Sequence, residues 1–222
     1  MRNNGAMATV FLLSPAYCGG RRAAIMLRPG SKLPIARRLQ EQTLSLGEAF
    51  SFMSGLYFRG KITYARAFAA TPDSTLVITP TRGLQSPDAV VTTDLLNEFA
   101  GVDISSDDVR YSQPLERDLQ ALAARMPADT RVVLLGSVAT GKYVDILMRW
   151  LGQRLHYPSS FVGRGDMSRG GLLLRHAASG VELDYSVLDP AARRHGPRPP
   201  RLDPATRVPQ AAAPARQAHD RP

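Results

Sequence analysis

The sequence predicts an α/β fold, namely a three-layer domain whose mostly parallel sheet carries helices on both faces. Three short, all-apolar runs (Thr9–Leu13, Leu76–Ile78 and Val132–Leu135) are separated by segments with helical periodicity. Strands without polar alternation are typical of parallel sheets that are covered on both sides. One later run, Val181–Leu188, alternates apolar with polar residues instead and indicates a strand with one wet face. It predicts a C-terminal β-hairpin at the sheet edge.

The composition divides the 222-residue chain into three parts. We expect a single α/β domain over residues 9–189, preceded by a flexible N-terminus at 1–8. Residues 190–222 are rich in proline, arginine and alanine and hold almost no large apolar side chain. Such a segment buries too little surface to offset its ordering entropy, so we expect a disordered basic tail. The tail supplies about +5 of the formal charge of +9.

The cysteine, the histidines and the hydropathy of the chain limit the classes of protein to which it could belong. A single cysteine, Cys18, excludes an intramolecular disulfide and suits a reducing compartment. The four histidines are scattered, so the sequence predicts neither a metal site nor a cofactor. No apolar run approaches the roughly 20 residues that span a bilayer. We therefore expect a cytoplasmic protein that does not associate with membranes.

Helical periodicity and capping residues predict the connecting elements in order. Leu33–Leu46 and Lys61–Ala69 each place apolar residues on one face, and Thr93–Ala100 forms a short helix. Ser112 is a good N-cap for the following helix, since Pro114 suits a first turn. The third strand leads into a helix over residues 142–155. For the C-terminal hairpin, residues 171–176 would pair with residues 181–188 across a turn at Gly180.

The predicted strand ends are rich in glycine and basic residues. In parallel sheets, ligands bind beyond the carboxyl ends of the strands. Glycines allow backbone N–H groups to approach a ligand, and arginine or lysine supplies the counter-charge for an anion. A later glycine-dense segment, Gly163–Gly171, would join the strand ends as a fourth loop. These loops predict a phosphate-binding pocket; alternatively, each is an ordinary turn with a solvated arginine. The candidate ligand-binding residues are Ser14, Gly19, Gly20, Arg21, Arg82, Gly136, Ser137, Gly141, Lys142, Arg164 and Arg169.

Two residues are candidates for catalysis. Cys18 lies in a glycine loop beside two arginines, where a lowered pKa would make the thiol a nucleophile; the alternative is a buried filler. Asp166 lies between Arg164 and Arg169, where it would activate water or bind a sugar hydroxyl, or else form a local salt bridge. A cluster of aromatic residues between 50 and 64 would either stack on a base or fill the core.

The segment Gly136-x4-Gly141-Lys142 has the spacing of a phosphate-binding P-loop. Tyr143, however, occupies the position where serine or threonine would ligate magnesium. About 46 residues of foldable chain follow, which is too few for the rest of a P-loop NTPase core. A degenerate P-loop ATPase is therefore kept only as a second alternative function.

Several short motifs together resemble a known group of proteins. They are Leu13-Ser14-x3-Cys18-Gly19-x-Arg21, Leu56-Tyr57 before Gly60, Val77-Ile78-Thr79-Pro80-Thr81-Arg82-Gly83-Leu84, and Gly141-Lys142-Tyr143. Their order is similar to that in a group of small uncharacterised bacterial α/β proteins. It is more distantly similar to peroxide-stress YaaA-like proteins and to domains related to uracil-DNA glycosylases. The resemblance implies an α/β core associated with nucleic-acid or nucleobase metabolism, and it carries over no catalytic residue.

The first functional hypothesis is that the protein binds a phosphate-bearing ligand (nucleotide, nucleoside or nucleic acid) at the carboxyl ends of its strands. Action on a glycosidic bond is its most specific form. The first alternative is a non-catalytic nucleic-acid-binding protein that uses its basic tail. The expected partner is accordingly an anionic small molecule or a nucleic acid.

Overall fold

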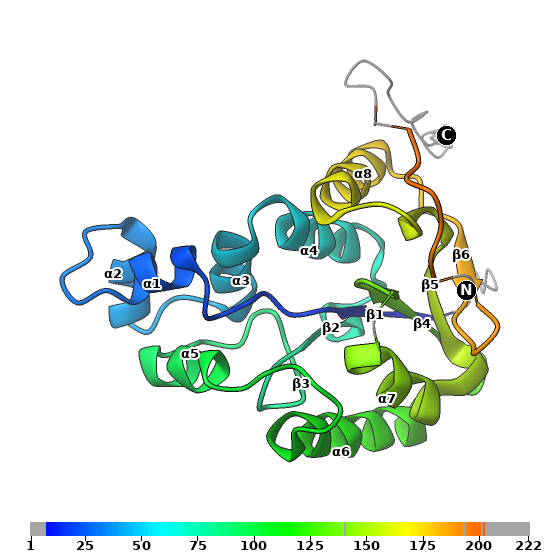
Figure 1. Cartoon of the computed structure of the whole chain (residues 1–222), viewed down its shortest axis with the longest axis horizontal. Helices are drawn as coiled ribbons and strands as arrows, with labels where there is room; N and C mark the ends of the chain where they lie inside the picture. The colour runs from blue at the N-terminus through cyan, green and yellow to red at the C-terminus, as the bar shows by residue number, and fades with distance from the viewer. Residues whose placement is uncertain (1–7, 140, 193, 201, 203–222) are drawn as a thin grey trace, which may run out of the picture.

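The computed structural model describes residues 8–139, 141–192, 194–200 and 202. Its centre is a six-stranded sheet in the order β3-β2-β1-β4-β5-β6 (Figure 1). The four central strands are parallel, while β3 and β6 run antiparallel to their neighbours at the two edges. The predicted α/β class and its antiparallel C-terminal pair are thus confirmed. The strands are β1 (Thr9–Leu13), β2 (Thr75–Ile78), β3 (Leu84–Gln85), β4 (Arg131–Leu135), β5 (Leu155–Pro158) and β6 (Tyr185–Val187).

Helices cover both faces of the sheet. On one side lie α3, α4 and α8, on the other α6 and α7, and α1, α2 and α5 extend beyond the ends of the central strands (Figure 1). No helix in the described ranges is long and apolar enough to cross a lipid bilayer. The helices are α1 (Arg21–Leu27), α2 (Pro34–Gln40), α3 (Leu46–Ser54), α4 (Leu56–Phe68), α5 (Thr93–Ala100), α6 (Val109–Arg125), α7 (Gly141–Leu151) and α8 (Asp166–Ser179).

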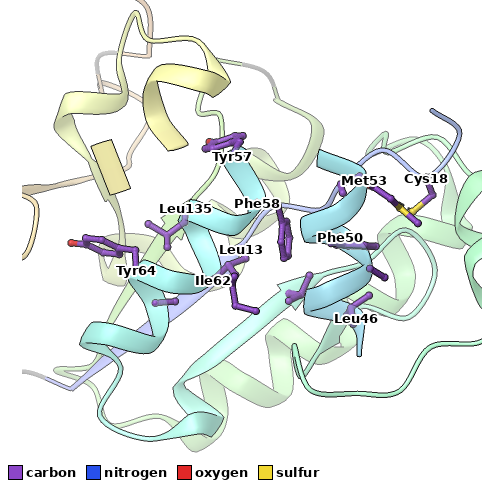
Figure 2. Packing of buried hydrophobic residues seen from close by; sticks show 14 of the residues in the cluster. Leu13, Cys18, Leu46, Phe50, Met53, Tyr57, Phe58, Ile62, Tyr64 and Leu135 are labelled. Carbon is purple, nitrogen blue, oxygen red and sulfur yellow. Dashed lines mark hydrogen bonds between the residues drawn. The ribbon is translucent and has the colours of Figure 1, made fainter. Parts of the chain in front are cut away.

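Each face of the sheet has its own apolar core. Figure 2 shows the first core, in which α3 and α4 carry aromatic residues such as Phe50 and Phe58 toward Leu13 and Leu135 of the strands. In the second core, Leu115 and other leucines of α6 pack with α7 and the opposite face of the same strands. Because successive residues of a strand point to opposite faces, apolar strands supply both cores at once.

Two glycines allow α4 and α8 to cross in close contact. A Cβ atom added to Gly60 would lie 2.7 Å from the carbonyl oxygen of Gly170, and one added to Gly170 would lie 2.7 Å from that of Leu56. Any side chain at either position would therefore push the helices apart. Lys61 and Arg169 are the chain neighbours of these glycines, so the crossing also brings two basic residues to the same place.

Of the eight α-helices in the described residues, the sequence predicted five, namely α2, α4, α5, α6 and α7, and only α5 has the predicted bounds. The predicted Leu33–Leu46 helix ends at Gln40, and a separate helix, α3, begins at Leu46. The helix predicted from Lys61 begins a turn and a half earlier, at Leu56, after Gly55 with φ of 65°. The N-cap of α6 is Asp108, whose side chain accepts a hydrogen bond from the Arg110 backbone N–H. The prediction of Ser112 as this cap is wrong, because a second polar residue four positions upstream competes for the role.

The C-terminal third differs most from the sequence prediction. The helix after β4 ends at Leu151, where Gly152 with φ of 51° turns the chain into a strand, β5, that was not predicted. Residues 171–176 belong to α8 and are not a strand. The antiparallel partner of β6 is therefore β5.

The first part of the predicted tail lies against the domain. Arg194 pairs with Asp145 of α7 at 3.5 Å, and Leu202 packs on the first core. Gly163, with φ of 75°, approaches the backbone of Pro197 so closely that a side chain there would clash. The predictions for residues 1–7 and 203–222 lie outside the described residues.

Candidate functional site

A cavity of about 500 Å³ opens at the carboxyl ends of β1 and β4. Its walls come from the segment after β1, from α3 and α4, from the start of α7 and from Asp166 at the start of α8. Its size lies within the usual range for small-molecule sites. The sheet geometry explains its location, since neighbouring parallel strands end at the same edge and leave a crevice beyond it.

Lys61 of α4 lies at the inner wall of this cavity and is 1% exposed. Its Nζ donates hydrogen bonds to the carbonyl oxygen of Ser14 at 2.7 Å and to Ser14 Oγ at 2.8 Å. It also lies 4.2 Å from the centroid of the Tyr57 ring. Burial lowers the pKa of Lys61 to about 7; the charge of Asp166 opposes this shift and that of Arg169 adds to it. No carboxylate of the described residues forms an ion pair with the ammonium group.

Arg169 of α8 provides a second buried cation nearby. Its Nε donates to the carbonyl oxygen of Phe161 at 3.3 Å, and its guanidinium lies 3.4 Å from a carboxylate oxygen of Asp166. The side chain of Arg169 is 8% exposed, whereas that of its acidic partner is 69% exposed. One solvated carboxylate therefore faces two buried basic side chains, which leaves the interior of the site with excess positive charge whenever Lys61 is protonated.

Two tyrosines complete the inner wall. The Tyr57 hydroxyl is buried close to the Arg169 guanidinium but makes no hydrogen bond of good geometry, and burial raises its pKa. The Tyr143 hydroxyl donates to the carbonyl oxygen of Ser137 at 2.9 Å. Burial raises the pKa of Tyr143 as well, although a hydrogen bond with Ser14 acts in the opposite direction. The Tyr143 side chain therefore contacts the segment over residues 136–142, which has P-loop spacing.

The structure gathers about half of the sequence-predicted residues around this cavity. Gly136 lies directly behind the wall, where a Cβ atom would come within 3.0 Å of Ser14 and Tyr143. Gly141 is the first residue of α7. The predicted residues that line the cavity are Ser14, Gly20, Arg21, Ser137, Lys142 and Asp166.

Other predicted residues lie elsewhere or have other partners. Arg82 follows β2, where it pairs with Glu98 at 2.6 Å, and it is not among the residues lining the cavity. Arg164 donates to the carbonyl oxygen of Ser160 at 3.0 Å. Gly19 lies under the Tyr17 ring, whose hydroxyl would be 2.7 Å from an added Cβ atom. The glycine there makes room for an aromatic side chain.

The structure gives Cys18 the surroundings of a core residue. Its side chain is 4% exposed and packs in the first apolar core (Figure 2). Burial raises its pKa to about 12, which disfavours the thiolate that a nucleophile requires. The flanking Arg21 and Arg22, which were expected to lower this pKa, are both exposed and line the cavity.

The Gly163–Gly171 segment is mostly helical and is not the predicted loop. Helix α8 begins at Asp166, so only the first three residues of this segment remain outside it. Gly170 serves the helix crossing instead of donating its N–H to a ligand. This segment therefore contributes Asp166 to the lining of the cavity, and Arg169 lies behind that lining.

Lys61 is the residue that sequence reasoning missed. It was interpreted as the start of a helix, with Ile62, Ala65 and Phe68 or Ala69 forming its apolar face. With the helix beginning at Leu56, Tyr57, Lys61 and Tyr64 follow each other at spacings of four and three, on one buried stripe. A lysine inside an aromatic stripe is the signal that could have identified it, because buried lysines are rare without a specific partner.

No known protein family matches the chain, and neither a curated protein nor a solved structure is significantly similar to it. The resemblance to YaaA-like and glycosylase-related proteins therefore stays a prediction. The described residues include no group of three or more histidine, cysteine or acidic side chains placed to hold a metal ion.

Proposed function

We propose that the cavity beyond β1 and β4 binds a small phosphate-bearing ligand. The observation that carries this proposal is the pair of buried cations, Lys61 and Arg169, whose only nearby acidic partner, among the described residues, is the solvated Asp166. Desolvating a cation is costly unless a counter-charge is present. A bound phosphate would supply that charge and would accept hydrogen bonds from both side chains.

The Tyr57 hydroxyl supports the same ligand. Buried polar groups nearly always have a hydrogen-bond partner, and one without a partner calls for an explanation. Tyr57 lines the cavity, and its ring centroid lies 4.2 Å from Lys61 Nζ and 6.0 Å from the Arg169 guanidinium, so a phosphate held by both cations would accept the proton of the hydroxyl. A ligand that satisfies Tyr57, Lys61 and Arg169 together must be a compact acceptor with several oxygens.

The mouth of the cavity suits the remainder of a nucleotide. Arg21, Arg22 and Lys142 are exposed basic residues on its rim, where they would attract an anion from solution. Tyr17 is 74% exposed at the same rim, an unusual position for a large aromatic ring. Such a ring would stack on a base, while the phosphate reaches inward.

The most specific form of the proposal is action on the glycosidic bond of a nucleoside or nucleotide. Asp166 is the candidate residue, because its carboxylate lies at the cavity rim and faces solvent. From there it would bind a sugar hydroxyl or activate a water molecule. Loss of base release in an Asp166→Asn variant that still binds phosphate would support this form.

Calorimetric titration of the full chain with inorganic phosphate and with a nucleoside 5′-monophosphate tests the proposal. At pH 6.5, where Lys61 is largely protonated, we expect Arg169→Gln to weaken binding roughly 10- to 100-fold. The matched control is Arg82→Gln, which removes an arginine that the sequence grouped with the site but the structure pairs with Glu98. Lys142→Gln tests the rim without touching a buried residue.

Three results would show that the cavity is not the phosphate-binding site. Wild-type protein that binds neither probe at millimolar concentration would overturn the proposal, as would equal losses in the Arg169 and Arg82 variants. Oligonucleotide binding with a steep salt dependence that Arg169→Gln leaves unchanged would instead support the basic tail as the binding element.

A further inference from the structure

Ser14 and Lys61 form a contact that phosphate binding alone does not require. Ser14 is the first residue after β1 and lines the cavity, and its backbone N–H donates to the carbonyl oxygen of Leu135 at 3.2 Å. Lys61 Nζ lies 2.8 Å from Ser14 Oγ. The Tyr143 hydroxyl lies near the same serine and donates its own proton to the carbonyl oxygen of Ser137, so toward Ser14 it can act only as an acceptor.

The partners of Lys61 allow it to change its protonation state in place. The protonated ammonium donates to the carbonyl oxygen and to the hydroxyl of Ser14, and its remaining N–H points to the region of the Tyr57 ring face. The neutral amine keeps the bond to the carbonyl oxygen and accepts the proton of the hydroxyl instead, since a hydroxyl can donate or accept. No other side chain must move, so the pair is preorganised for proton transfer.

We propose that Ser14 is a nucleophile and Lys61 its general base, in a site that transfers the phosphoryl group of a phosphate ester. The inference rests on the proposed function: Arg169, which stays cationic, would hold the phosphate beside Ser14 Oγ in those molecules whose Lys61 is neutral. A serine hydroxyl is a weak nucleophile unless an adjacent base removes its proton. Burial, which lowers the pKa of Lys61 to about 7, makes the neutral amine available near physiological pH.

The reaction would have two steps. In the first, Ser14 Oγ attacks phosphorus, the bond from phosphorus to the alcohol oxygen breaks, and the proton of Ser14 passes through Lys61 to the departing oxygen. In the second, water attacks the phosphoserine, the bond from Ser14 Oγ to phosphorus breaks, and the proton of water returns through Lys61 to Ser14 Oγ. The products are the alcohol and a free phosphate group.

The remaining residues would stabilise charge and fix positions. Arg169 stays cationic throughout and would offset the charge that develops on the phosphoryl oxygens. Tyr143 is a positioning residue that acts through Ser14 Oγ. Asp166 is not needed for this reaction, which separates it from the glycosidic form of the proposed function.

Covalent labelling with diisopropyl fluorophosphate tests the inference on the full chain. In this reaction Ser14 Oγ would bond to phosphorus and fluoride would leave, adding one diisopropylphosphoryl group that mass spectrometry locates. We expect labelling at Ser14, with a rate that rises through about pH 7 to a plateau as Lys61 loses its proton. Lys61→Met should slow labelling roughly 100-fold or more and remove this pH dependence.

The matched control is Ser106→Ala, which alters an exposed serine that does not line the cavity and should be labelled at the wild-type rate. Ser14→Ala should not be labelled. Phosphate binding by the wild type without labelling at Ser14 would overturn this inference and leave the proposed function intact. Labelling without phosphate binding would overturn the proposed function and support a reactive serine alone. A labelling rate without a pH midpoint near 7 would remove Lys61 from the role of base.

Discussion

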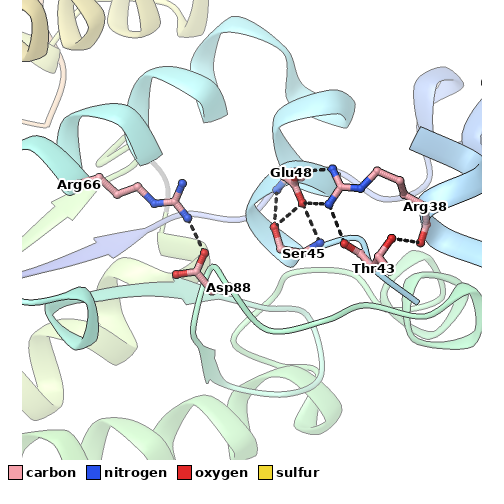
Figure 3. A network of polar contacts seen from close by, with 6 residues as sticks. All are labelled: Arg38, Thr43, Ser45, Glu48, Arg66 and Asp88. Carbon is pink, nitrogen blue, oxygen red and sulfur yellow. Dashed lines mark hydrogen bonds and ion pairs between the residues drawn. The ribbon is translucent and has the colours of Figure 1, made fainter. Parts of the chain in front are cut away.

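Two basic regions on adjacent helices of the same face satisfy their charges in opposite ways. On α3, Glu48 receives hydrogen bonds from the Arg38 guanidinium and from the Ser45 backbone N–H and hydroxyl, and Arg66 pairs with Asp88 close by (Figure 3). The four charged side chains are between 43% and 61% exposed. Around Lys61, by contrast, the cation is buried and its partners are a carbonyl oxygen, a hydroxyl and an aromatic ring.

Under the proposed function, the first region serves the fold and the second serves a ligand. The Glu48 network ends a loop and begins a helix through a capping box, so it has a complete structural explanation. The Lys61 environment lowers the stability of the folded state when the lysine is protonated, and nothing in the fold requires the charge. A costly buried charge that lines a cavity is typical of a functional site.

The largest expected effect on stability comes from Lys61→Met. Burial places the folded pKa at about 7, below the unfolded value of 10.5, so the folded state is penalised fully below pH 7. The penalty falls as pH rises from 7 toward 10.5, because the unfolded state then binds more protons than the folded state. We expect the variant to be about 1–4 kcal/mol more stable than wild type at pH 6, with the gain shrinking at pH 9. Urea unfolding at both values measures this.

Lys142→Met is the control for that experiment, since it removes a lysine from the exposed rim of the same cavity. Its effect should be small and nearly independent of pH. A Lys61→Met variant that is destabilised equally at pH 6 and pH 9 would show that Lys61 stabilises the fold, and the contrast with the Glu48 network would disappear.

The next largest effect on stability is expected where α4 and α8 cross at Gly60 and Gly170, since this crossing brings Lys61 and Arg169 together. Gly170→Ala would place a methyl group within 3 Å of the backbone at Leu56 and Tyr57 and should cost about 1–3 kcal/mol. Gly171→Ala is a matched control in the same helix, because its Cβ atom would meet nothing closer than 3.8 Å. It should stabilise α8 by about 0.5–1 kcal/mol. Thermal unfolding of both variants tests the crossing, and equal effects would refute it.

The smallest effect is expected for Glu48→Gln. Losing the ion pair with Arg38 and weakening the capping box should cost about 1 kcal/mol, because the pair is half exposed and solvent screens it. Hydrogen bonding to Arg38 lowers the folded pKa of Glu48 to about 2, below the unfolded value of 4.5. The contribution is therefore present above pH 4.5 and is lost as pH falls toward 2. Acid unfolding at two salt concentrations measures this contribution of Glu48 to stability. A change in phosphate affinity in the Glu48→Gln variant would contradict the separation of the two regions.

The sequence predicted the fold where its signals were local. Apolar strands such as Thr9–Leu13 appear in the structure with the predicted bounds, since strands buried on both faces leave no alternation to misinterpret. The prediction for the C-terminal third was wrong for a physical reason. Residues 171–176 form a short apolar run that periodicity alone cannot assign to a helix or a strand, and only its packing against α4 shows that it continues a helix.

The candidate site was predicted in location but not in chemistry. Ser14, Ser137 and Lys142 lie at strand ends, which topology brings together, and so sequence reasoning could find them. Lys61 comes from the middle of α4, and the close approach of this helix to α8 at Gly60 brings Lys61 and Arg169 together. Its signal along the chain, a lysine inside the stripe of Tyr57 and Tyr64, becomes visible only when the start of α4 at Leu56 is known.

The most direct test of the account is the titration of Lys61 itself. The chain contains only three lysines, Lys32, Lys61 and Lys142, so isotope-labelled side-chain ammonium and methylene signals can be assigned by NMR with single variants. We predict a Lys61 pKa near 7 in the free protein and a rise of this pKa when inorganic phosphate is added, because a bound anion favours the protonated amine. A Lys61 pKa that stays near 10.5, or one near 7 that phosphate does not move, would contradict the account.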